Sequence, residues 1–152
     1  MPELVVRPCQ RRDLPAVCAI EEASFPDPYP MDFFEWLLAR MGSGFLVACE
    51  SGIVLGYVVC GVVGAGKGHL ISIATLPGSR RTGVGTRLME SVIGQLGEKG
   101  VSVVRLEVRQ SNTAAISFYA GLSFVESGRK KRYYPDGEDA VVMMKRLGPG
   151  MD

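Results

Sequence analysis

The stretch "ISIATLPGSRRTGVGTRLME", residues 71–90, decides how we expect the chain to fold. It opens with β-branched and alternating residues, which indicate a strand, and it ends in an apolar repeat that indicates a helix. Between them, Gly83 and Gly85 allow the backbone to approach a ligand closely, and successive N–H groups ahead of the helix form an anion nest. Arg80 and Arg81 add positive charge that suits a phosphate. The stretch therefore predicts a strand, an anion-binding loop and a helix.

Two other interpretations compete with this one. The glycines could instead serve only the packing of the helix on the strand. A second glycine-rich stretch, "GVVGAGKGHL" at residues 61–70, also begins the nucleotide-binding pattern G-x-x-x-x-G-K-[S/T]. It is followed by a strand rather than a helix, and Gly68 replaces the magnesium-binding Ser or Thr, so we expect a hairpin turn there. A pyrophosphate bound without metal in the loop after residue 76 fits better than nucleotide hydrolysis.

The composition is that of an ordinary soluble globular protein. The 152 residues suffice for one domain, 1–152, that buries roughly 70% of its unfolded surface. Hydrophobic residues make up 47% and charged residues 22%, and the net charge is +1, so no general basic field for nucleic acid is present. We expect no partner nucleic acid and no membrane, a cytoplasmic location, and a flexible tail at about residues 148–152.

Cysteine and histidine are too sparse for a metal centre. The four cysteines form no C-x-x-C pair, and there is a single histidine. We expect buried thiols that act as small hydrophobic groups. A disulfide remains an alternative only if the organism is a hyperthermophile, because intracellular disulfides do occur in such organisms.

The expected elements follow the order βααβββαβαββ, with a helix capped by Asp13 after the first strand. The predicted strands are residues 4–9, 44–50, 53–63, 69–76, 101–108, 122–127 and 139–147, and the later helices are residues 31–41, 82–100 and 112–120. Residues 101–108 form an almost continuous apolar run, which is expected of a central strand buried on both faces. The fold class is α/β, or α+β, with a single mixed sheet.

Four blocks of the sequence, in the correct order, resemble one family. "RRTGVG" matches the acetyl-CoA signature [Q/R]-x-x-G-x-[G/A] of the Gcn5-related N-acetyltransferase (GNAT) superfamily, with Arg80, Gly83 and Gly85 at the defining positions. "LEVRQSNTAAISFYAGLSF", "RYYPDGEDAVVMMKRL" and "FPDPYPMDFF" resemble blocks of the RimI-like and archaeal N-terminal acetyltransferases. The resemblance covers nearly the whole chain. It implies a GNAT fold of about seven strands flanked by four helices, and transfer of acetyl from acetyl-CoA to the α-amine of a protein N-terminus.

The resemblance also implies where acetyl-CoA binds. Its pyrophosphate is expected on the loop and helix start, and its pantetheine and acetyl groups are expected along the preceding strand, where that strand splays from its neighbour. The implied cofactor-binding residues are Arg80, Arg81, Thr82, Gly83, Val84, Gly85 and Thr86, then Ile73, Ala74 and Thr75, and finally Asn112 and Tyr119. No metal is expected.

Three residues are candidates for proton transfer. Glu107 lies in an apolar strand, where burial would raise the pKa of its carboxyl toward neutrality, although pairing with Arg105 or Arg109 is an equal alternative. The resemblance implies that Glu107 is the general base and Tyr119 the general acid. It also implies that His69 relays protons through water together with Glu107, where the alternative is a structural histidine. We expect the oxyanion donor to be a backbone N–H near Ala74.

Peptide recognition is expected from the loop "FPDPYP" and from the last hairpin. The candidate substrate-binding residues are Pro26, Asp27, Tyr29, Tyr133 and Tyr134, and the tyrosines could equally serve packing. The related enzymes have glutamate where this chain has Asp27, and asparagine where it has Pro28, so the preferred N-terminal residues stay open. An acidic group here would attract a cationic N-terminus. The ribosome or ribosomal proteins are candidate partners, and we expect a monomer or a weak dimer.

Other functions stay open at this point. An acetyltransferase for a small amine or a lysine side chain would share the fold, and a module that binds acyl-CoA without turnover would share the loop. A covalent acetyl-cysteine route is not favoured, because none of the four cysteines falls in a block that matches the family.

Overall fold

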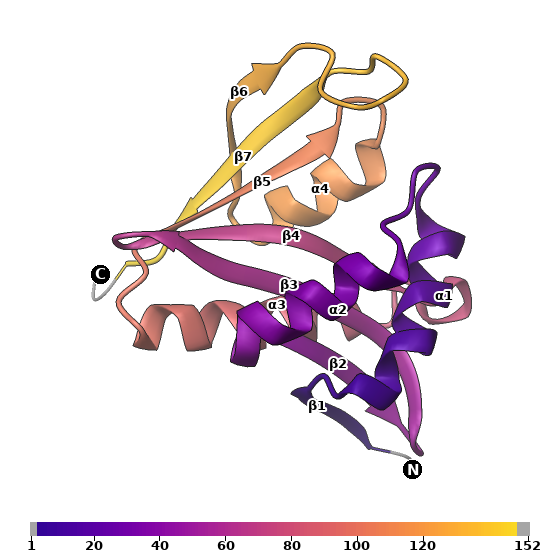
Figure 1. The fold of residues 1–152 in the computed structure, drawn as a ribbon. Helices are drawn as coiled ribbons and strands as arrows, with labels where there is room; N and C mark the ends of the chain where they lie inside the picture. Colours follow the sequence, from indigo (N-terminus) through magenta and orange to yellow (C-terminus); the bar gives the residue numbers. More distant parts are fainter. Residues whose placement is uncertain (1–2, 149–152) are drawn as a thin grey trace.

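The computed structural model describes residues 3–148 and shows a seven-stranded mixed sheet with four helices (Figure 1). The expected tail falls almost wholly outside the described residues. The strands are β1 Leu4–Pro8, β2 Phe45–Glu50, β3 Ile53–Gly64, β4 Lys67–Thr75, β5 Val103–Arg109, β6 Val125–Lys130 and β7 Ala140–Arg146. The helices are α1 Leu14–Ser24, α2 Met31–Met41, α3 Val84–Glu98 and α4 Thr113–Gly121, with short 3-10 turns at Arg11–Asp13, Gly42–Gly44 and Pro77–Ser79. The expected element order and fold class are confirmed.

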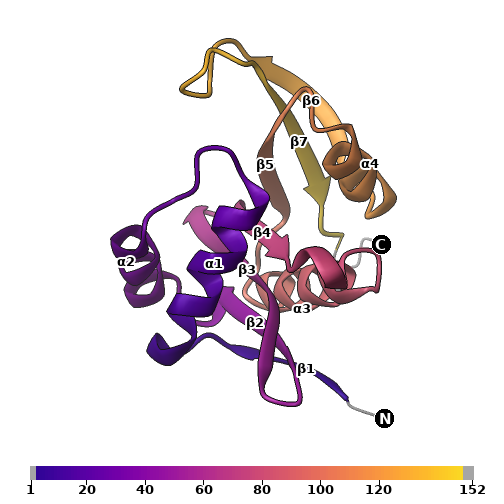
Figure 2. The ribbon, with the colours of Figure 1, turned by 90° about the vertical axis from the view of Figure 1, so that its right-hand side faces the viewer.

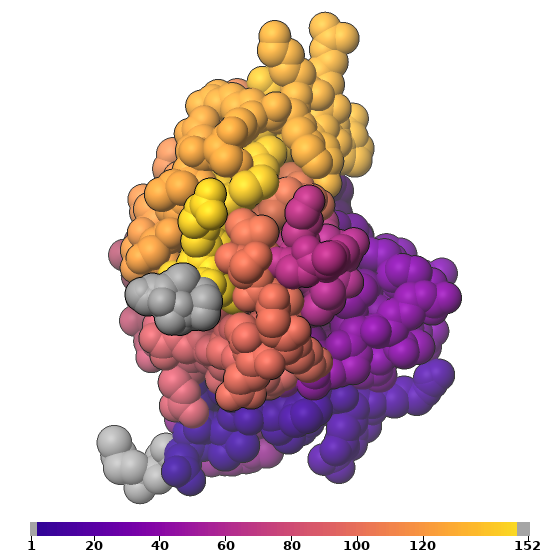
Figure 3. Space-filling view, turned by 90° about the vertical axis from the view of Figure 1, so that its left-hand side faces the viewer, coloured from indigo at the N-terminus to yellow at the C-terminus, as the bar shows by residue number. Residues whose placement is uncertain are grey.

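The sheet opens between β4 and β5. Its strand order is β1-β2-β3-β4-β5-β7-β6, and only the pair β4–β5 is parallel. These two strands pair solely at their beginnings, Lys67–His69 with Val103–Arg105, and separate beyond that point. Figure 1 shows them meeting at the left and diverging to the right, and Figure 3 looks onto the closed end. The backbone groups of β4 that face this opening have no strand to pair with, which makes it a place for a ligand.

Helices cover both faces of the sheet. Helices α3 and α4 lie on one face, where Leu88, Val92 and Leu106 belong to one core cluster. Helices α1 and α2 lie on the other, where Val17, Phe34 and Leu37 are fully buried in a second cluster (Figure 2). Burying each such side chain contributes about 1.5–3 kcal/mol relative to exposure, so both faces stabilise the sheet that carries the opening.

The stretch 61–70 is a β-hairpin that leads into strand β4 and not into a helix. Residues of β3 and β4 pair across it, Gly61 with His69 and Val62 with Gly68, so the turn itself is only Ala65-Gly66. A Cβ at Gly61 would lie 2.2 Å from Sδ of Met41, which explains the glycine by packing. The expected turn is therefore shorter than the glycine pattern indicated.

Two local predictions were wrong, one of them only in part. Strand β5 is not apolar and buried on both faces: Val104 and Leu106 are buried on one face, whereas the charged residues Arg105, Glu107 and Arg109 alternate with them on the other and are less completely buried. Asp13 is the N-cap residue of α1, as expected, but its side chain makes no capping hydrogen bond, because its carboxylate accepts from the guanidinium of Arg7 and from the N–H of Gln10.

The cysteines carry free thiols. Three are buried and the fourth, Cys18, is partly exposed. Burial raises the pKa of Cys60 to about 12, so this thiol is unreactive at neutral pH. Among the described residues, no helix is long and apolar enough to cross a membrane.

Candidate active site

The opening between β4 and β5 places backbone groups of three expected residues beside it. On one side Ile73, Ala74 and Thr75 pair with β3, opposite Val58, Tyr57 and Gly56. On the other side they lie beyond the last residue of β4 that pairs with β5. Their outward N–H and C=O groups are therefore free to bind an extended polar chain, as the amides of a pantetheine arm require.

The loop before α3 has the backbone geometry of an anion nest. Arg81 has a φ of 64° and Gly83 a φ of 90°, both in the left-handed region. A residue other than glycine in this region costs roughly 1–2 kcal/mol, so the strain at Arg81 marks a site that the surrounding structure holds in place. The first hydrogen bond that closes α3 runs from the N–H of Arg87 to the C=O of Gly83 at 3.0 Å. The N–H groups of residues 84–86 precede it and point out of the helix start, where they can hold a phosphate.

Glycine is favoured at positions 83 and 85 for different physical reasons. A Cβ at Gly83 would meet nothing within 4 Å, so its positive φ is what favours glycine. A Cβ at Gly85 would lie 3.2 Å from the ring of Phe118 in α4, so packing of the two helices favours glycine there. The alternative interpretation, packing of the helix on the strand, is met at neither glycine, because Gly83 has no close neighbour and Gly85 packs against helix α4. The exposed side chain of Arg80 donates to the hydroxyl of Ser24 at 3.1 Å.

Glu107 lies at the centre of a charged cluster near the point where β4 and β5 separate. His69 Nε2 lies 2.7 Å from Glu107 Oε1, and Oε2 accepts from Arg105 Nε at 2.9 Å and from Lys130 Nζ at 3.2 Å. The carboxylate has only 6% of its side chain exposed. Burial raises the pKa of Glu107, but the hydrogen bonds and charges of His69 and Lys130 outweigh it and bring the pKa to about 2. The expectation of a pKa raised toward neutrality was therefore wrong, because His69 of β4 and Lys130 of β6 stabilise the ionised form.

Tyr119 belongs to α4 and lies on the face of the sheet opposite Glu107, in the core cluster that α3 and α4 form with the sheet. Its ring is 5.4 Å from that of Phe118 and 5.9 Å from that of Phe124. Among residues 3–148 its hydroxyl makes no hydrogen bond, and burial raises its pKa above the usual value for tyrosine. A phenol that stays protonated at neutral pH is a suitable proton donor. Asn112 caps α4, because its Oδ1 accepts from the N–H of Ala115 at 3.2 Å.

The candidate peptide loop between α1 and α2 is held by a residue that sequence reasoning missed. Glu21 is buried, and its carboxylate accepts from the hydroxyls of Tyr57 and Ser72 and from the N–H of Tyr29 at 3.0 Å. The signal was present, since Glu21 continues the apolar helical period of Val17 and so falls on the buried face of α1.

The last loop, between β6 and β7, contributes the two adjacent tyrosines. The rings of Tyr133 and Tyr134 meet edge to face at 5.0 Å, and Tyr133 is 46% exposed. Asp27, across the entrance, is not free to attract a cation as expected, because its Oδ1 accepts from Arg109 Nη2 at 2.9 Å. Pro26 is exposed beside it. Arg109, like Arg105 and Lys130, was not among the predicted site residues.

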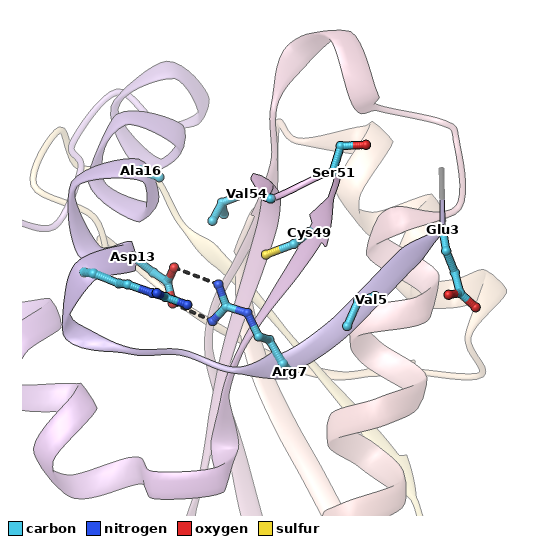
Figure 4. A pocket seen from close by; sticks show the side chains of 10 residues that line it. Glu3, Val5, Arg7, Asp13, Ala16, Cys49, Ser51 and Val54 are labelled. Carbon is cyan, nitrogen blue, oxygen red and sulfur yellow. Dashed lines mark hydrogen bonds and ion pairs between the residues drawn. The ribbon is translucent and has the colours of Figure 1, made fainter. Parts of the chain in front are cut away.

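A hollow lies away from this site, at the β1–β2 edge of the sheet. It has a volume of about 660 Å³ and is lined in part by Val5, Arg7, Cys49 and Val54 (Figure 4). Arg7 points toward Asp13 and donates to both of its oxygens, at 2.7 and 3.0 Å. That guanidinium holds the pKa of Asp13 below its usual range. Arg7 and Asp13 therefore neutralise each other within the hollow.

The parts described so far lie on two faces of the sheet, on either side of the opening between β4 and β5. The anion nest and Tyr119 lie on the face of α3 and α4. The Glu107 cluster lies on the other face, together with the loop that carries Asp27. The opening between β4 and β5 connects them. Within residues 3–148 no group of three or more His, Cys, Asp or Glu residues could hold a metal ion.

Comparison with known proteins identifies the family. Residues 12–124 match the acetyltransferase (GNAT) family, and the chain belongs to it. It is 35% identical over 147 residues to the N-alpha-acetyltransferase of Sulfolobus acidocaldarius, which covers 89% of this chain and 88% of that protein. It is also 35% identical over 136 residues to the ribosomal protein bS18-alanine N-acetyltransferase of Escherichia coli K12, covering 86% and 89%. The crystal structure of Ard1 from Thermoplasma volcanium superposes with a TM-score of 0.93 at 27% identity, covering 96% of this chain and 99% of that one. The expected family, fold and enzyme class, an N-acetyltransferase, are confirmed.

Proposed function

We propose that the protein transfers the acetyl group of acetyl-CoA to the α-amine of a protein or peptide N-terminus, by direct attack while both reactants are bound. One observation carries the proposal: the His69–Glu107 pair, 2.7 Å apart, stands near the point where β4 and β5 separate, on the face of the peptide loops. An amine that enters from that face meets a proton acceptor and then the opening. The names of the relatives in Sulfolobus and Escherichia coli support the choice of acceptor.

The donor side fits acetyl-CoA. When bound, this molecule supplies the thioester carbonyl that is attacked and the thiolate that leaves. The residues with free backbone groups along β4 would orient the pantetheine arm, and the nest at Arg81 and Gly83 would hold the pyrophosphate. Holding both reactants side by side can supply ~7 kcal/mol or more of the lowering of the barrier.

On the side of the acceptor amine, we assign the role of proton acceptor to the imidazole of His69. Glu107 is ionised but, with a pKa of about 2, it is too weak a base to deprotonate an ammonium group efficiently. Its role is to accept the Nε2–H of His69, so that Nδ1 is the ring nitrogen that gives up and takes up a proton. Arg105 and Lys130 bind the other oxygen and so fix the carboxylate. His69 takes the amine proton directly or through a water molecule.

Two further groups complete the reaction. A backbone N–H of β4 near Ala74, on the side open to β5, would donate to the developing oxyanion. The protonated hydroxyl of Tyr119, on the opposite face, would return a proton to the leaving thiolate. The base and the acid thus act on opposite faces of the sheet, which suits attack from one side and departure on the other.

A panel of amines tests the acceptor class. Thiol release from acetyl-CoA is measured with peptides that begin with Ser, Ala, Thr or Met, and with free lysine and polyamines. We expect turnover on the peptides at least about tenfold faster than on the small amines. Faster turnover on lysine or polyamines would favour the alternative acceptor, and binding of acetyl-CoA without turnover on any amine would favour a binding module. Ribosomal proteins as substrates, and a cytoplasmic location, go with this proposal.

A further inference from the structure

Arg109 lies between the α1–α2 loop, residues 25–30, and the β6–β7 loop, residues 131–139. We call the space between these two loops the peptide entrance. Its Nη2 donates to Asp27 of the α1–α2 loop at 2.9 Å. Its Nη1 donates to Asp136 and to Glu138 of the β6–β7 loop, each at 2.9 Å. The guanidinium carbon also lies 4.2 Å from the ring centroid of Tyr134. With only 13% of the side chain exposed, Arg109 makes these contacts in a largely desolvated position, where charge-assisted hydrogen bonds are strong.

The two loops come from opposite halves of the chain. Asp27 and Arg109 are 82 residues apart in the sequence. Both ribbon views show the α1–α2 loop rising beside the β6–β7 loop at the open end of the sheet (Figures 1 and 2). Each loop has an anchor of its own: the N–H of Tyr29 binds Glu21, and the N–H of Ser111 binds Glu138. Among hydrogen bonds and ion pairs of residues 3–148, the Asp27–Arg109 contact is the one that ties the α1–α2 loop to the β5–β7 half.

We infer that Arg109 latches these loops together and so sets the width of the peptide entrance. It is a positioning residue that acts through Asp27 on one side and through Asp136, Glu138 and Tyr134 on the other. This inference rests on the proposed function, because it takes the two loops to be the walls of the peptide site. Only arginine fits the position, since its planar fork reaches both loops at once, whereas the single ammonium group of lysine does not.

The latch concerns the peptide and not acetyl-CoA. Arg109 lies on the α1–α2 face of β5, with Glu107, whereas the anion nest belongs to the other face. Opening the latch would therefore weaken binding of the peptide and leave binding of acetyl-CoA unchanged. The carboxylate partners Asp27 and Asp136 are 38% and 60% exposed, so salt would screen the latch.

The test compares Arg109→Gln and Arg109→Lys with the wild type. We expect Arg109→Gln to raise the KM for peptide at least tenfold while the KM for acetyl-CoA changes less than twofold, and Arg109→Lys to fall between. Asp27→Asn should raise the peptide KM in the wild type but add little in the Arg109→Gln background, because the contact is already lost. Arg129→Gln, which removes the exposed contacts of Arg129 with Glu126 and Gln110 and leaves the partners of Arg109 in place, is the control and should change neither KM.

A second readout does not depend on activity. Trypsin can cut after the exposed Lys131 and Arg132 in the β6–β7 loop, and we expect this cut to be several-fold faster in Arg109→Gln than in the wild type or in Arg129→Gln. If the wild type acetylates no peptide but the cut is faster, the latch stands and the proposed function fails. If the wild type acetylates peptides, but Arg109→Gln leaves the cut unchanged or raises both KM values equally, the latch is refuted.

Discussion

Replacing Glu107 by glutamine tests how the proton acceptor is arranged. The substitution keeps the shape of the side chain but offers one acceptor oxygen in place of two. Arg105 Nε and Lys130 Nζ both donate to one side of the carboxylate, and His69 Nε2 lies 2.7 Å from the other oxygen. The two cationic donors will hold the amide oxygen on their side, so the NH₂ group faces His69. The imidazole must then present Nε2 as an acceptor and carry its proton on Nδ1.

The size of the effect follows from this change of tautomer. With Nδ1 protonated, the lone pair that takes the amine proton is lost. Losing a positioned general base costs typically ~10²–10⁴ in rate, which corresponds to about 3–5 kcal/mol of the activation free energy. We expect kcat to fall by this factor. The KM for acetyl-CoA should stay within about twofold, because the anion nest lies on the other face of the sheet and does not involve Glu107.

The assay is thiol release at saturating peptide and acetyl-CoA, with circular dichroism to check folding. Glu126→Gln on the exposed strand β6 is the matched control and should retain full activity. A Glu107→Gln enzyme that keeps more than about a third of the wild-type kcat would refute the reasoning, since no tautomer change of His69 could then be limiting.

Three further predictions follow from particular residues. The pKa of Glu107 is about 2 in the fold and ordinarily about 4.3; its carboxylate therefore stabilises the fold above about pH 4.3 and loses this contribution as the pH falls toward 2. The difference in Tm between the wild type and Glu107→Gln should accordingly be largest near neutral pH and shrink toward pH 2–3, and a constant difference would contradict the low pKa. Tyr119→Phe keeps the ring packed between Phe118 and Phe124 and removes the proton donor, so kcat should drop about tenfold or more with little change in Tm; full activity would remove Tyr119 from the mechanism. Gly83→Ala places a side chain at a φ of 90°, which costs roughly 1–2 kcal/mol and distorts the nest. Calorimetry should therefore show weaker binding of acetyl-CoA to this variant. Gly94→Ala, inside helix α3, is the control and should bind acetyl-CoA normally.

Much of the fold could be predicted because its signals are local. Ser51-Gly52 forms a turn with both φ values positive, at 52° and 79°, and Gly100 ends α3 with a φ of 88°. The helical period of Val84, Leu88, Val92 and Leu96 marks the buried face of α3. Such patterns depend on neighbours in the sequence, so they can be found without knowing the tertiary structure.

The electrostatics of the site depend on residues that only the fold brings together. Glu107 receives His69 from β4 and Lys130 from β6, 38 and 23 residues away, and these contacts reverse the effect that burial alone has on its pKa. The pairing of Arg109 with Asp27 is equally non-local, and it turns an acidic group expected to attract the substrate into part of a latch. Strand β5 was misjudged for a related reason: its apolar run hid the fact that its polar residues share one face.

The central claim is that the acceptor is the α-amine of a peptide chain, and the position of the acetyl group on a product tests it most directly. A peptide with a free N-terminal serine and an internal lysine is incubated with acetyl-CoA and the wild-type protein, and the product is sequenced by tandem mass spectrometry. The account predicts acetyl on the N-terminal amine, with the lysine unmodified, and no product when the N-terminus is blocked beforehand. Acetyl on the lysine, at a rate unaffected by the blocked N-terminus, would contradict it.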